Sequence, residues 1–209
     1  MTGYAKRFAG VFFTIAMLTR LLSSSPALGA DIIVDTLSED VLKNAIVSAT
    51  SADVVRITAE GVITLTGQIT ISKEVKIVGP GQDKLAISGN NAYRVFSVAS
   101  NVSADISELS IVSGVVSGNG GGLYNLSNKL TVTNCTFSGN RASYGGGMYN
   151  AYCSPIVSNC TFSGNSADSA GGMFNWQANS MVTNCTFIPA HKKKDLPNQG
   201  DPSHKLTNN

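Results

Sequence analysis

Short apolar runs separated by small polar residues make up most of the chain. From residue 54 onward, stretches rich in Val, Ile and Leu alternate with Gly, Asn and Ser. This is the pattern of β-strands joined by tight turns. Glycine is abundant, at 21 residues against 6 prolines, and it suits tight corners because it accepts backbone angles closed to other residues. The pattern predicts strands over residues 54–57, 62–65, 69–71, 75–78, 85–87, 95–98 and 106–112.

One segment near residue 40 has helical periodicity. Thr36 and Glu39 have the spacing of a capping box, in which each side chain satisfies a free backbone N–H of the first helical turn. A helix here would cover the first turn of a β-fold, whose strand edges and core are otherwise open. The apolar residues expected on its buried face are Leu42, Ala45, Ile46 and Ala49.

Two phrases recur with a common step of 25 residues in the second half of the chain. Asn-Cys-Thr-Phe stands at 134–137, 159–162 and 184–187, and Gly-(Leu/Met)-(Tyr/Phe)-Asn stands at 122–125, 147–150 and 172–175. Interleaved repeats of this kind are typical of a solenoid in which each repeat forms one turn and like residues stack. No Asn-Gly hairpin lies between strongly alternating runs, which favours parallel strands. We therefore predict an all-β, parallel β-helix (solenoid) of about five to six turns with a short N-terminal capping helix.

Alternation within each repeat predicts which side chains face the core. Val132, Cys135 and Phe137, with their equivalents in later repeats, are the expected inward columns, whereas Thr131 and Thr136 should face outward. The expected stacks of cysteine and phenylalanine are Cys135, Cys160, Cys185, Phe137, Phe162 and Phe187.

Asparagine columns are expected at the corners of the coil. Asn134, Asn159 and Asn184 lie where the alternation slips by one residue, which predicts a corner with hydrogen bonds between stacked amides. Asn140 and Asn165 are expected to form a second column.

The four cysteines follow two patterns. Cys135, Cys160 and Cys185 share one phase of the repeat, so their α-carbons should lie about 4.8 Å apart, within the range of a disulfide. Parallel side chains, however, hold the β-carbons further apart than a bridge prefers, which favours buried free thiols. Cys153 falls outside the series and is expected to be an exposed or loop thiol.

The N-terminus has the features of a secretory signal peptide. Lys6 and Arg7 precede an apolar run over residues 8–18, and small residues follow near residue 30. The alternative is a membrane anchor, but a bilayer needs roughly 20 apolar residues and Arg20 interrupts this run. No later segment is apolar and long enough to span a membrane, so a secreted or cell-surface location is expected.

The repeat phrases resemble those of a known family. Phe-Ser-Gly-Asn at 137–140 and 162–165 fits an F-x-x-N repeat, and the Gly-Gly phrases at 121–124, 146–149 and 171–174 are similar to the accompanying G-G-A-I type repeat. Together they resemble bacterial polymorphic outer-membrane proteins and related right-handed parallel β-helix proteins, over about residues 31 to 187. The resemblance implies a right-handed parallel β-helix that is secreted or surface-displayed, often an adhesin-like passenger. Larger members carry more repeats, so a truncated product with no role of its own is a further alternative.

Three regions follow from these patterns. We predict a signal peptide over residues 1–30, a β-helix with its cap over 31–187, and a disordered or atypical tail over 188–209. The tail contains the run His191-Lys192-Lys193-Lys194. It could bind an anionic surface, but a solvated end whose Lys and Pro residues blunt the last strand edge is favoured.

The charge pattern bears on catalysis. Charged residues are 13% of the chain and the net charge is +2, which gives no case for nucleic-acid binding. Cleavage of polysaccharides by β-helix enzymes needs paired carboxylates, or carboxylates that hold Ca²⁺ beside a base. Between residues 109 and 190 the charged residues are Lys129, Arg141 and Asp168 alone. The early carboxylates, expected to be scattered and solvated, are those of Asp53, Glu60, Glu74 and Asp83.

The expected function is therefore a non-enzymatic surface or secreted module, with no catalytic residues, metal or cofactor. A polysaccharide lyase, or another carbohydrate-active β-helix enzyme, is the alternative. If Leu123, Met148 and Met173 point inward, an aromatic column would face outward and could bind a glycan or a host or cell-surface protein. In the opposite orientation the same rings would belong to the core. The members of this candidate site are Tyr124, Tyr149, Phe174 and Trp176.

Overall fold

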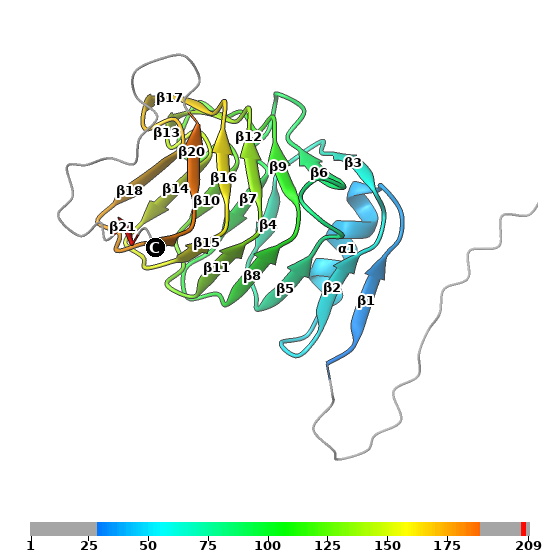
Figure 1. The fold of residues 1–209 in the computed structure, drawn as a ribbon. Coiled ribbons are helices and arrows are strands. Elements are labelled where there is room, and N and C mark those ends of the chain that lie inside the picture. The colour runs from blue at the N-terminus through cyan, green and yellow to red at the C-terminus, as the bar shows by residue number, and fades with distance from the viewer. Residues whose placement is uncertain (1–28, 189–205, 208–209) are drawn as a thin grey trace, which may run out of the picture.

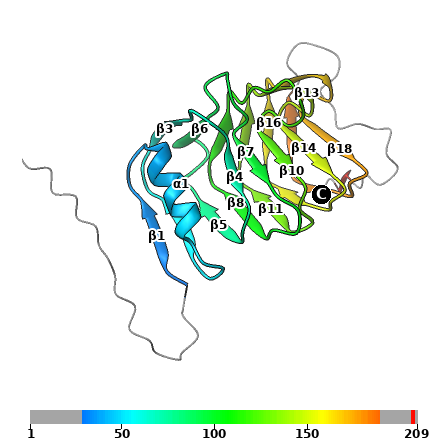
Figure 2. The ribbon, with the colours of Figure 1, turned by 180° about the vertical axis from the view of Figure 1, so that it is seen from behind.

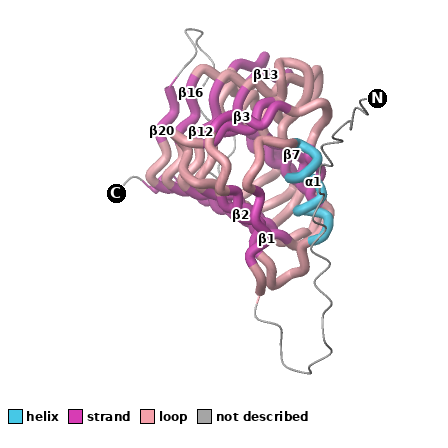
Figure 3. Tube along the Cα trace, turned by 90° about the vertical axis from the view of Figure 1, so that its right-hand side faces the viewer, coloured by secondary structure: helices cyan, strands magenta, loops and turns pink. Residues whose placement is uncertain are grey.

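The chain forms a parallel β-helix with a short N-terminal helix, as predicted. The computed structural model describes residues 29–188 and 206–207. Their backbone winds through about six turns, and most turns add one strand to each of three sheets (Figure 1). Figure 3 looks along this coil from the end at which the helix lies. Nearly all of the predicted signal peptide and of the predicted tail lies outside the described residues.

Three sheets enclose the core. Sheet A contains β1 (Asp31–Val34), β2 (Val54–Ile57), β5 (Val75–Val78), β8 (Ala104–Ser107), β11 (Leu130–Thr133), β15 (Ile156–Ser158), β19 (Met181–Thr183) and β21 (Leu206–Thr207). Sheet B contains β3 (Gly61–Thr64), β6 (Leu85–Ser88), β9 (Ser110–Val112), β12 (Thr136–Ser138), β16 (Thr161–Ser163) and β20 (Thr186–Ile188). Sheet C contains β4 (Ile69–Ile71), β7 (Phe96–Val98), β10 (Leu123–Asn125), β14 (Met148–Ala151) and β18 (Met173–Trp176).

Strands of successive turns pair in parallel, with equivalent residues side by side. Phe137 is the register partner of Phe162, and Phe162 of Phe187. Their rings stack face to face at centroid distances of 4.6 and 4.7 Å. Phe137 and Phe162 are fully buried, whereas Phe187 in the last turn is only partly buried. The predicted inward columns are therefore confirmed.

The expected single strand over residues 106–112 is two strands. β8 ends at Ser107 and β9 begins at Ser110, and Glu108 between them has a φ of 58°. This left-handed backbone turns the chain from sheet A into sheet B. Asn134, Asn159 and Asn184 make the same corner in later turns, with φ between 50° and 54°.

The helix α1 (Glu39–Ser48) closes the N-terminal end of the coil (Figure 2). Its predicted apolar face is confirmed, because the side chains of Leu42, Ala45, Ile46 and Ala49 all belong to the main core.

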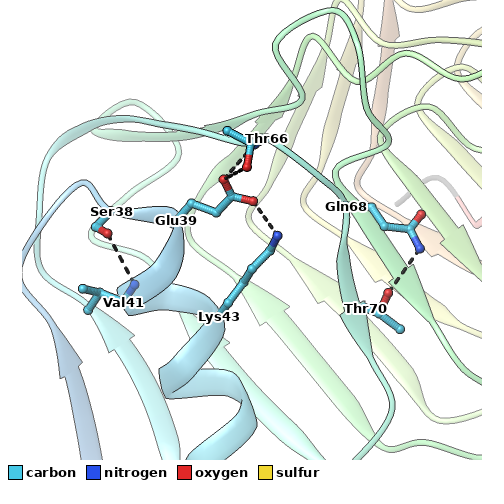
Figure 4. A network of polar contacts seen from close by, with 7 residues as sticks. All are labelled: Ser38, Glu39, Val41, Lys43, Thr66, Gln68 and Thr70. Carbon is cyan, nitrogen blue, oxygen red and sulfur yellow. Dashed lines mark hydrogen bonds and ion pairs between the residues drawn. The ribbon is translucent and has the colours of Figure 1, made fainter.

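The predicted capping box is wrong by two residues. Ser38 is the N-cap, and its hydroxyl accepts a hydrogen bond from the Val41 N–H (Figure 4). Glu39 is the first helical residue, and its carboxylate accepts from the N–H and hydroxyl of Thr66 in the first turn and pairs with Lys43. The carboxylate that sequence spacing assigned to the helix end therefore ties α1 to the coil.

A fourth, smaller sheet was not predicted. β13 (Arg141–Tyr144) and β17 (Ser166–Ser169) pair in parallel between sheets B and C of two successive turns, and single bridges join Val115 to Arg141 and Asn119 to Tyr144. We call β13, β17 and residues 115–119 the side arm. Its sequence alternates small and polar residues without an apolar period, so nothing in the pattern marks it as a strand pair.

Candidate functional site

The predicted aromatic column stands on the outer surface of sheet C. Leu123, Met148 and Met173 are fully buried in the main core. Tyr124, Tyr149 and Phe174, the next residues along each strand, therefore face away from it. They are register partners, and their rings stack at centroid distances of 5.5 and 5.4 Å.

Most of this column is buried, although it faces away from the main core. Tyr149 is 7% exposed and Phe174 is 5% exposed. Tyr144 of the arm meets the Phe174 ring edge-on at 5.3 Å, and Ala151 and Ala170 complete a small second core. Burial raises the pKa of the Tyr149 hydroxyl. Each of the two orientations considered from the sequence is therefore correct in part. The rings face away from the main core, but two of them are buried like core residues.

Arg94 closes the N-terminal end of the column. Its guanidinium lies 5.0 Å from the centroid of the Tyr124 ring, a favourable cation–π distance. The same group donates to the backbone carbonyls of Asn119 and Gly120 and to the side chain of Gln68. Arg94 therefore joins the column to the side arm.

Trp176 differs from the rest of the candidate site. It is 48% exposed and lies on the outer surface of sheet C as the register partner of Ala151. Its indole N–H donates to the hydroxyl of Tyr152, which is 64% exposed. We call Trp176 and Tyr152 the aromatic pair.

Sequence reasoning missed Tyr152. It follows the end of β14, where the chain adopts a φ of 54°. The equivalent residue one repeat later is Gln177, which has a similar φ of 46°. The backbone therefore repeats at this position while the side chain does not, so the repeat offered no signal for an aromatic residue. The aromatic pair therefore depends on a tyrosine at a repeat position that holds glutamine in the next turn.

Two ladders of buried asparagines run through the coil. The Asn140 amide donates to the side-chain oxygen of Asn165, and both residues are buried, as predicted for the second column. Asn125 donates to Asn150 and Asn150 to Asn175 in a ladder that the sequence analysis did not identify. These contacts satisfy buried polar groups between turns and are structural.

The corner asparagines do not form the predicted amide stack. Asn159 and Asn184 are exposed, and the contact that the Asn134 amide makes is to the Glu108 carboxylate. Their left-handed backbone is the reason for asparagine at these positions, since asparagine adopts positive φ more readily than most residues.

The prediction of an exposed or loop thiol at Cys153 is correct about the loop, which lies between β14 and β15, but wrong about the exposure. Its side chain is 2% exposed, and its sulfur lies 3.2 Å from the Asn125 amide nitrogen. Burial raises its pKa to about 11. A reactive surface thiol is thereby excluded at this position. The other three cysteines are free and stacked, as predicted.

Several carboxylates in the described residues pair with separate cations. Asp31 pairs with Arg56, Asp105 with Lys76 and Glu60 with Lys84. The hydrogen bond from Arg56 lowers the pKa of Asp31.

Asp53, expected to be solvated, is instead 7% exposed, and its carboxylate accepts from Ala30 and Thr50. It closes the loop before β2. Across residues 29–188, no three His, Cys, Asp or Glu side chains are grouped so that they could hold a metal ion.

Comparison with known proteins finds no relative of this chain. No family model matches the chain, and searches of curated proteins and of solved structures find no match. Within the part of the chain that the structure describes, no helix has the length and apolar character needed to cross a bilayer.

Proposed function

We propose that this protein is an exported, non-enzymatic β-helix module that binds a glycan or a cell-surface protein through the aromatic pair. Trp176 and Tyr152 present large ring surfaces to solvent at the C-terminal end of the coil. Such rings stack on sugars and anchor protein partners. The exposed aromatic pair is the observation that carries the proposal.

The surroundings of the pair support recognition of an uncharged ligand. The charged residues between positions 109 and 190 are Lys129, Arg141 and Asp168. Lys129 precedes β11, and the other two lie in the side arm. The hydrogen bond between the indole and the Tyr152 hydroxyl fixes the two rings relative to each other. Preorganised rings lose less conformational entropy when a partner binds.

Substitution of Trp176 tests the binding site. We expect Trp176→Ala to lose most binding to a glycan array or to intact cells, because it removes the larger ring, whereas Trp176→Phe should retain part of it. Tyr93→Ala is the matched control, since Tyr93 is 40% exposed but lies in an early turn. Equal binding by Trp176→Ala and the unaltered protein would refute the site. Circular dichroism checks that each variant is folded.

The enzymatic alternative is a polysaccharide lyase. Asp31, Glu60 and Asp105 each face a cation from an adjacent strand or turn, and this separation favours a passive role over carboxylate chemistry. The test is the release of unsaturated products from a panel of acidic polysaccharides, with and without Ca²⁺. We expect no turnover; sustained turnover would establish the enzyme instead.

Export has its own test. We expect residues 1–30, fused to a reporter, to direct the reporter out of a bacterial cell. N-terminal sequencing of the mature full-length protein should begin near Asp31, where small residues precede the first strand. Retention of the intact N-terminus in the cytoplasm would contradict export.

A further inference from the structure

Three thiols stand in single file inside the last turns. The sulfur of each lies near the backbone carbonyl of the preceding turn, at 3.6 Å for Cys135 and Ile106, 3.7 Å for Cys160 and Val132, and 3.6 Å for Cys185 and Val157. Each sulfur thus occupies the same place in its own turn. Successive sulfurs therefore lie one strand spacing apart, about 4.8 Å.

This spacing is unsuited to a disulfide and suited to a bridging ion. A disulfide needs its sulfurs about 2.0 Å apart, which would pull two paired strands together. Zinc–sulfur bonds are about 2.3 Å long, and an ion with bonds of that length, placed midway between two opposed sulfurs, would separate them by about 4.6 Å. Thiolates are the ligands that Cu(I) and similar soft ions prefer.

We propose that Cys160 and Cys185 bind one soft monovalent cation, Cu(I), in linear two-coordinate geometry. The ion displaces both thiol protons to solvent and forms two sulfur–metal bonds, with no change in oxidation state. The hydrogen bonds from the thiols to the Ser158 and Thr183 carbonyls are lost in exchange. Two opposed sulfurs suffice for this geometry, so a group of three ligands is not required.

Access selects this pair over Cys135 and Cys160. Cys135 and Cys160 are at most 1% exposed, whereas Cys185 in the last turn is only partly buried. An ion that arrives at the C-terminal end of the coil therefore meets Cys185 first and has Cys160 directly behind it. The site is separate from the aromatic pair, and it stands or falls independently of the proposed function.

Titration of the reduced, full-length protein with Ag(I), and with Cu(I) under anaerobic conditions, tests the site. We expect one equivalent to bind with a sulfur-to-metal charge-transfer band in the ultraviolet, and X-ray absorption of the copper form to show two sulfur neighbours. Cys160→Ser and Cys185→Ser should each abolish the tight equivalent. Cys135→Ser and Cys153→Ser are matched controls that should retain it, because each leaves the proposed pair intact.

Several outcomes would overturn the assignment. Retention of the tight equivalent in Cys185→Ser, its loss in Cys135→Ser, or its loss in Cys153→Ser would each place the ion elsewhere. Three or more sulfur neighbours would exclude linear coordination. Serine keeps the size and the hydroxyl donor at each position, and circular dichroism identifies any variant that fails to fold. If Cys160→Ser does not fold, Cys185→Ser and Cys135→Ser still decide between the two pairs.

Discussion

Asparagines have two different roles in this coil, one for buried and one for exposed residues. Asn140 is fully buried, and its side chain accepts from the Gly114 N–H while donating to the Ile111 carbonyl and to Asn165. Asn159 is exposed at a corner with a φ of 54°. The first residue hydrogen-bonds to groups in the turns before and after its own, whereas the other mainly accommodates a backbone angle.

Replacement of the buried residue should therefore cost far more stability. We expect Asn140→Ala to lower the free energy of unfolding by about 2–4 kcal/mol, since it leaves a buried N–H and a buried C=O without their partner. Asn159→Gly, which suits positive φ, should change it by less than about 1 kcal/mol. Urea unfolding of the two variants provides the comparison. Similar losses would show that the ladder contributes little.

The buried thiols predict a fall in stability at alkaline pH. The hydrogen bond with Cys135 and burial raise the pKa of Cys160 to about 12, and burial raises that of Cys153 to about 11. Unfolded thiols ionise near pH ~8.5. Between pH ~8.5 and 11 the unfolded state thus loses protons that the folded state keeps, and stability should fall by about 1.4 kcal/mol per pH unit for each thiol.

Denaturant unfolding under reducing conditions at pH 7, 8, 9 and 10 measures this slope. We expect Cys153→Ser to reduce the slope of the unfolding free energy against pH by the contribution of one thiol. A surface change such as Asp40→Asn should leave this slope unaltered, because Asp40 is exposed. An identical slope in Cys153→Ser and the unaltered protein would contradict the assignment.

Among the elements, α1 shows how a contact outside the local sequence determines where a helix begins. Spacing alone made Thr36 the cap and Glu39 its partner, but Thr66 and Lys43 hold the Glu39 carboxylate. Thr36 itself is exposed, and the cap moves to Ser38. The apolar face was predictable because it repeats every three or four residues; the cap was not, because a distant turn fixes it.

Two substitutions distinguish these caps. We expect Ser38→Ala to destabilise the protein by about 1 kcal/mol, the usual cost of a lost N-cap. Thr36→Ala should have an effect near zero. Thermal melting followed by circular dichroism gives both changes in stability. A larger loss for Thr36→Ala than for Ser38→Ala would support the capping box predicted from the sequence.

The same distinction holds for the other elements: features that repeat along the sequence could be predicted, and features without a repeat could not. The core columns at Phe137 and Cys135 could be predicted, since a fixed step places like residues in register. The side arm could not, because its small polar residues carry no apolar period. At the candidate site, the sequence could place Tyr149 on the outer surface of sheet C but could not show that its ring is buried there.

At the scale of the whole molecule, the two ends of the coil differ. α1 covers the first turns, and its apolar side chains join the main core. In the described residues, sheets B and C end at β20 and β18, and Phe187 is only partly buried. Each turn of a solenoid gains its stability from its neighbours, so the final turn has the least support.

Hydrogen exchange should reveal this gradient. We expect amides of β18 and β20 to exchange faster than those of β7 and β9. Within the described residues, β18 and β20 each pair with a strand on one side alone, and local opening needs less free energy there. Phe162→Ala should cost about 3–5 kcal/mol, and Phe187→Ala clearly less because its side chain is only partly buried. Uniform protection from end to end would contradict the gradient.

Because of its position, the fluorescence of Trp176 reports this difference between the two ends of the coil. It is the single tryptophan of the chain, and it lies at the end of β18, where its indole N–H donates a hydrogen bond to Tyr152. Its emission therefore reports the detachment of one terminal coil, whereas ellipticity averages over every strand. A fluorescence midpoint that precedes the ellipticity midpoint during denaturation would be the optical signature of a molecule that unravels from one end.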